Sequence, residues 1–165
     1  SVIAELLFEK MLREKNLDDQ YNVTSRGLQG TPGWPVLPTH GNLKYYNKST
    51  GKAIWEQSQP ALEKIGIEEE LKKNKATVIT TADFEKADLV IGMNTDVLDD
   101  PKWGLKAQFP RYSNIVILYT EIVGSDEGIE DAYESKEGGN KYEKTVIEIA
   151  DVMENGFDNL IKRIQ

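Results

Sequence analysis

Two short runs of consecutive apolar residues constrain the fold of this chain most strongly. They are Leu89-Val-Ile91, within the segment 88–93, and Ile115-Val-Ile-Leu-Tyr119. Strands that helices cover on both faces of a parallel sheet have this continuous apolar pattern. Amphipathic helices are predicted at 1–15, 60–66 and 141–164, with one helical turn at 82–86. Because helices and strands alternate, we expect an α/β fold: a three-layer α/β/α domain with a doubly wound parallel sheet.

Weaker strand patterns occur at 21–25, which alternates and ends before Gly27, and at 77–80. Between them, residues 27–59 form a long irregular stretch that is rich in Gly and Pro. Aromatic side chains within it, which bury large areas when they pack, predict that it lies against the body of the protein. We therefore expect a single domain over 1–165 with a long irregular insertion at about 27–59.

The helix predicted at 1–15 begins abruptly. Ser1 takes the N-cap position with no loop before it, and Val2, Ile3, Leu6 and Leu7 start the apolar stripe at once. A free amino group at this position places a positive charge at the positive end of the helix dipole, which is unfavourable. We therefore expect that a segment normally precedes this helix.

Composition excludes several classes of function. The 165 residues carry a formal net charge of -8, which argues against binding to a nucleic-acid backbone, and no run approaches the ~18 apolar residues of a membrane span. The absence of cysteine removes disulfides, thiolate catalysis and thiolate metal sites, and a single histidine, His40, makes a multi-His site or a Ser-His pair hard to build. No metal or cofactor is expected. Acidity and the lack of a visible signal peptide favour the cytoplasm.

Several stretches, taken in order, resemble the low-molecular-weight protein tyrosine phosphatases. Ser1-Val-Ile-Ala-Glu-Leu-Leu-Phe8 is similar to the family's Ser-Pro-Ile-Ala-Glu-Ala-Leu-Phe, which starts the helix after its catalytic loop. Glu130-Asp-Ala-Tyr133 is similar to the Asp-Pro-Tyr segment that carries its general acid. The other matching segments are Ser25-Arg-Gly27, Ala61-Leu-Glu-Lys-Ile-Gly-Ile67, Ala76-Thr-Val-Ile-Thr80 and Ala87-Asp-Leu-Val-Ile-Gly-Met93. The resemblance spans nearly the whole chain.

The resemblance implies hydrolysis of phosphotyrosine or aryl phosphate monoesters. In the family a Cys thiolate attacks phosphorus, a loop from this Cys through five residues to an Arg holds the phosphate, and a Ser follows the Arg. Here the numbering begins at that Ser, so the first strand and the Cys/Arg loop are expected before residue 1. Ser1 then matches the thiolate-supporting Ser, and Asp131 matches the general acid. Val2 and Ala132 replace family prolines, and Ala132 is expected to aim Asp131 less well.

The chain as printed lacks the nucleophile, so we expect it to be inactive. Without its first strand, the strands at 21–25 and 77–80 are expected to flank a gap with unpaired backbone groups. An alternative is a non-catalytic phosphatase-like module that binds a protein or an anion, with its sheet completed by another strand or in a dimer. The expected partners are a phosphotyrosine protein or small aryl phosphate for the intact enzyme, and a phosphate or sulfate anion near Ser1.

Each candidate side chain also has a structural interpretation. Asp131 lies among many acidic residues at 126–137, a pattern that is typical of a solvent-exposed loop. Their spacing does not fit an EF-hand, which argues against a calcium site. Tyr133, Trp34 and Trp55 are candidates for the wall of an aryl pocket, and equally for packing of the long loop. Arg26 is either an anion contact or a surface charge.

Overall fold

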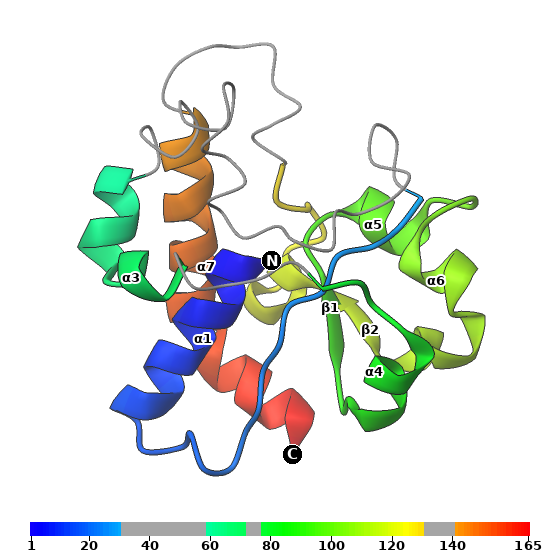
Figure 1. Cartoon of the computed structure of the whole chain (residues 1–165), viewed down its shortest axis with the longest axis horizontal. Helices are drawn as coiled ribbons and strands as arrows, with labels where there is room; N and C mark the ends of the chain where they lie inside the picture. The colour runs from blue at the N-terminus through cyan, green and yellow to red at the C-terminus, as the bar shows by residue number, and fades with distance from the viewer. Residues whose placement is uncertain (31–58, 72–76, 131–140) are drawn as a thin grey trace.

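The computed structural model describes residues 1–30, 59–71, 77–130 and 141–165 (Figure 1). In this part of the chain, strands β1 (Val90–Gly92) and β2 (Val116–Leu118) form a two-stranded parallel sheet. Their register places Val90 opposite Val116 and Gly92 opposite Leu118. β1 lies within the predicted strand segment 88–93 and β2 within 115–119, so the prediction of a parallel sheet at these segments is confirmed.

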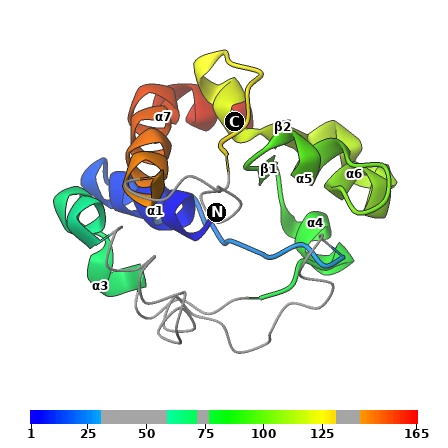
Figure 2. The same ribbon diagram turned by 90° about the horizontal axis from the view of Figure 1, so that it is seen from above.

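One face of the sheet is covered by α1 (Val2–Glu14) and α7 (Lys141–Ile164) (Figure 2). The apolar stripe of α1 buries Leu7, Phe8 and Leu12, and the rings of Phe8 and Phe157 pack with their centroids 5.4 Å apart. The helix ends in a Schellman motif around Asn16, which has a left-handed φ of 57°. The N–H of Leu17 donates to the carbonyl of Leu12 (2.8 Å), and that of Asn16 to the carbonyl of Arg13 (3.1 Å). The helices predicted at 1–15 and 141–164 are confirmed.

Short helices and a second apolar cluster cover the other face. The elements are α4 (Thr81–Lys86), α5 (Thr95–Asp99), α6 (Leu105–Gln108) and the 3-10 helix η2 (Pro110–Ile115). Phe84 of α4 lies at the centre of this cluster, 4.5 Å from the ring of Phe109 and 5.1 Å from that of Tyr112. A further 3-10 helix, η3 (Tyr119–Val123), follows β2 and packs on α7. The layers are therefore helix, sheet and helix, as the α/β prediction requires (Figure 2).

The strands predicted at 21–25 and 77–80 do not form as ladders. Residues 21–26 are extended, and the residue after them, Gly27, forms one isolated parallel bridge with Val78. The N–H of Gly27 donates to Thr77 (2.7 Å), and the carbonyl of Gly27 accepts from Ile79 (3.0 Å). The bridge is made by Gly27, after the predicted strand 21–25, so the expectation that 21–25 and 77–80 flank a gap stays a prediction. In the described residues, the backbone of 21–26 lacks a strand partner and lies on the side of β1 away from β2 (Figure 2).

The remaining predictions fall partly outside the described residues. Residues 59–65 are helical, and Gly66 follows with a left-handed φ of 74°, so the helix predicted at 60–66 is confirmed. Short α3 (Glu68–Leu71) comes next and packs on α1. Most of the insertion at about 27–59 lies outside the described residues, so the single-domain division stays a prediction. No helix in the described ranges is long and apolar enough to cross a membrane.

Candidate functional site

The N-terminus of α1 lies beside the carboxyl end of β1 (Figures 1 and 2). Ligands of open α/β sheets bind at the carboxyl ends of the strands, so this is the edge at which a site is expected. Ser1 is the N-cap of α1, as predicted, and its side chain is exposed and makes no capping hydrogen bond to the helix. Its carbonyl accepts from the N–H of Glu5 (3.0 Å). The first turn of this 13-residue helix therefore directs backbone N–H groups and the positive end of its dipole to this edge.

A hydrogen bond ties the first turn of α1 to the extended segment. The hydroxyl of Ser25 donates to the carboxylate of Glu5, a contact between residues 20 apart in sequence. The next residue, Arg26, donates through Nε to Asp83 of α4 (3.0 Å) and through its terminal nitrogen to the carbonyl of Ser25 (2.8 Å). The end of segment 21–26 is thus fastened to α1 on one side and to α4 on the other.

Arg26 is engaged in an ion pair rather than presented to solvent. The side chains of Arg26 and Asp83 are only 26% and 27% exposed, so both are half-buried. Burial alone would raise the pKa of Asp83, but hydrogen bonds from Thr80 and the ion pair with Arg26 lower it below its usual range. Arg26 therefore stabilises the contact between the extended segment and α4.

Residues 127–130 also approach the carboxyl end of β1. The N–H of Ile129 donates to the carbonyl of Met93, directly after β1 (2.8 Å), and the buried Thr120 hydroxyl donates to the carbonyl of Glu127 (2.5 Å). Gly128 fits closely here, because a Cβ at this position would lie 2.5 Å from the Cα of Asn94. The described chain that leads to residue 131 is therefore fixed at the same edge of the sheet as the N-terminus of α1.

Charge at this approach is mostly negative. The Glu130 carboxylate pairs with Lys141 Nζ at 2.7 Å, at the first residue of α7. Burial, followed by the nearby Glu130 carboxylate, raises the pKa of Glu148. Among the residues that the structure describes, no group of three His, Cys, Asp or Glu side chains is arranged to hold a metal ion.

Of the predicted site residues, the structure describes Ser1. Asp131, Tyr133, Trp34 and Trp55 lie outside the described residues, so their roles stay predictions. The contact of Ser25 with Glu5 was not predicted, because no spacing rule links residues so far apart. For Arg26 the sequence allowed either an anion contact or a surface charge, whereas the structure shows a half-buried ion pair.

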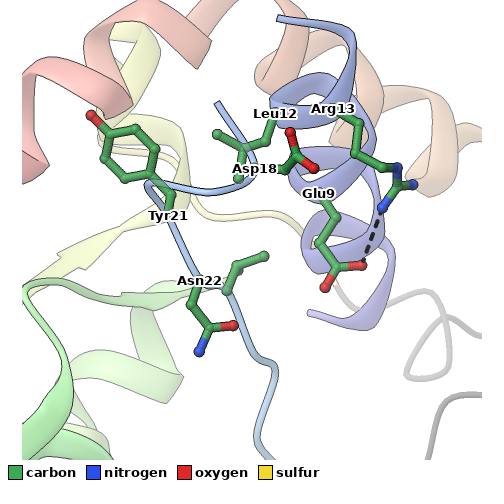
Figure 3. Close-up of a pocket in the computed structure, with 7 residues that line it drawn as sticks. Glu9, Leu12, Arg13, Asp18, Tyr21 and Asn22 are labelled. Carbon is green, nitrogen blue, oxygen red and sulfur yellow. Dashed lines mark ion pairs between the residues drawn. The ribbon is translucent and has the colours of Figure 1, made fainter. Parts of the chain in front are cut away.

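A pocket of about 180 Å³ lies elsewhere, between α1 and residues 18–23 (Figure 3). Its lining includes Glu9, Arg13, Asp18, Tyr21 and Asn22. Glu9 is eight residues along α1 from Ser1, which corresponds to about 12 Å. The pocket is therefore separate from the edge at which α1 begins.

Neither a protein-family model nor a curated protein sequence matches this chain. Solved structures do match it. The low molecular weight protein tyrosine phosphatase from T. tengcongensis has a TM-score of 0.67 at 20% identity, over 95% of this chain and 88% of that chain.

Two further structures match over 97% of this chain. A YwlE mutant from Bacillus subtilis gives a TM-score of 0.62 at 21% identity over 88% of its own chain. A product state mimic of a protein tyrosine phosphatase from Entamoeba histolytica gives a TM-score of 0.57 at 15% identity over 86% of its own chain. These likenesses agree with the resemblance noted in the sequence, and the chain has the fold of the low molecular weight protein tyrosine phosphatases.

Proposed function

We propose that this domain hydrolyses phosphotyrosine or aryl phosphate monoesters once a Cys/Arg phosphate-binding loop precedes Ser1. The observation that carries the proposal is the fold, which matches a low molecular weight protein tyrosine phosphatase over 95% of this chain. The arrangement of the carboxyl edge supports it. The start of α1 and the residues before 131 both lie at this edge, so an anion at the helix N-terminus and an acid at 131 would be neighbours.

The chain supplies only part of the chemistry that we propose. Ser1 would support the thiolate through its hydroxyl, and Asp131 would protonate the leaving aryl oxygen and then activate water. Tyr133, Trp34 and Trp55 are proposed as aromatic walls for the aryl ring. The thiolate is not supplied, because the sequence has no cysteine. The 165-residue polypeptide by itself is therefore proposed to be inactive, although the N-terminus of α1 should still attract phosphate or sulfate.

A chimera tests this proposal. The first strand and Cys-x5-Arg loop of the T. tengcongensis phosphatase would be fused directly before Ser1, and hydrolysis of p-nitrophenyl phosphate measured. We expect turnover by the chimera and none by its Cys→Ser variant or by the 165-residue chain. Circular dichroism and thermal unfolding establish that all three proteins are folded. A folded chimera that is no faster than its Cys→Ser variant would contradict the proposal, and turnover by the 165-residue chain would contradict the role given to the thiolate.

A second candidate function is a non-catalytic module that binds another chain by strand addition. The observation that favours it is the backbone of Tyr21, Asn22, Val23 and Thr24, which makes no hydrogen bond to a strand in the described part of the protein. Tyr21 and Val23 are half-buried, whereas Asn22 and Thr24 are exposed to solvent. An unpaired backbone group costs about 1–3 kcal/mol when it is buried, so the penalty falls on the half-buried residues. An added strand would pair these groups.

Apolar side chains beside this backbone indicate what such a strand would be. Val23, Leu89 and Ile91 are only half-buried and pack at the margin of the main core, whereas Val116 and Leu118 of β2 are buried at 7% and 4% exposure. Val90 belongs to the cluster on the other face of the sheet. The added strand would therefore be uncharged and apolar on both faces, and it could come from a second copy of this chain.

Oligomeric state and peptide binding test the second candidate. Sedimentation equilibrium should give twice the 18.6 kDa of one chain if a second copy completes the sheet. A monomer whose residues 21–26 are protected from hydrogen exchange by an apolar strand peptide, and not by the same peptide with a central proline, would indicate a separate partner. A monomer that no such peptide protects would exclude this function.

Cytoplasmic location stays a prediction, which fractionation of the source cells would test.

A further inference from the structure

We draw no further inference here: the strongest candidate, the pocket between α1 and residues 18–23 that Glu9, Arg13 and Asp18 line (Figure 3), is a cluster of charged side chains with no second observation in the described part of the chain to identify a ligand.

Discussion

A substitution at Gly156 of α7 tests how closely this long helix packs on η3. A Cβ built at Gly156 would lie 2.4 Å from Cγ1 and 2.7 Å from Cδ1 of Ile122, and 3.0 Å from its Cβ. Ile122 is fully buried, with 0% exposure, so its side chain has no solvent into which to move. Replacement of this glycine brings two opposing effects into one measurement.

The substitution Gly156→Ala gains about 1 kcal/mol from helix propensity. Overpacking in a core costs about 1–3 kcal/mol. The upper half of that range applies, because the clashing atoms lie near the stem of a β-branched side chain whose χ1 rotation is restricted. The loss exceeds the gain, and we expect the free energy of unfolding to fall by about 1–2 kcal/mol.

Urea unfolding of Gly156→Ala measures this difference. The matched control is Glu154→Ala, an exposed position two residues earlier in α7, which is expected to leave the stability within about 0.5 kcal/mol. Ile122→Ala in the same background should relieve part of the clash, so the double variant loses less than the two single variants together. A Gly156→Ala protein that is as stable as the parent, or more stable, would refute the packing of α7 on η3.

Three further substitutions test single contacts. Tyr119→Phe removes a buried hydroxyl that donates to the Ile149 carbonyl (2.8 Å) and keeps the ring, so urea unfolding should show a loss of about 1 kcal/mol; an unchanged midpoint would contradict the bond. The pKa of Asp83 is lowered in the folded state, so its contribution is present above its usual pKa of 3.8 and is lost as the pH falls below that value. Asp83→Asn should therefore destabilise the protein at pH 7 and not at pH 2, and an equal loss at both would exclude a charge effect. The pKa of Glu148 is raised in the folded state, so its ionisation lowers stability as the pH rises above 4.5, and Glu148→Gln should stabilise the protein at pH 7 but not at pH 4.

Sequence patterns correctly predicted those helices and strands whose apolar faces are buried in the hydrophobic core. The stripe of α1 packs against α7, which the same periodicity predicts, so local and tertiary preferences agree there. The runs around Val90 and Val116 also pack against residues of α5, α6 and η2, which no sequence pattern predicted. The alternation at 21–25 predicted a strand, but a ladder also needs a neighbouring backbone. In the described part of the chain, a neighbour is present only at Gly27.

The sequence predicted the candidate site only where a local feature of the chain determines the position of a residue. Ser1 follows from helix capping, because a single N-cap position begins the helix. The contact of Ser25 with Glu5 and the ion pair of Arg26 with Asp83 join residues 20 and 57 apart. Such pairs depend on how the helices pack on the sheet, which hydrophobic periodicity does not specify.

The dependence of hydrolysis on the leaving group tests most directly whether this chain carries the acid of a phosphatase. In the chimera with the Cys/Arg loop, Asp131→Asn should lower kcat/KM for phenyl phosphate by about 10²-fold or more, because the phenolate must be protonated as it leaves. The loss for p-nitrophenyl phosphate should be much smaller, since p-nitrophenolate leaves without a proton. Asp126→Asn, in the same acidic stretch, is the matched control and should leave both rates unchanged. Equal losses for the two substrates, or no loss in Asp131→Asn, would contradict the account.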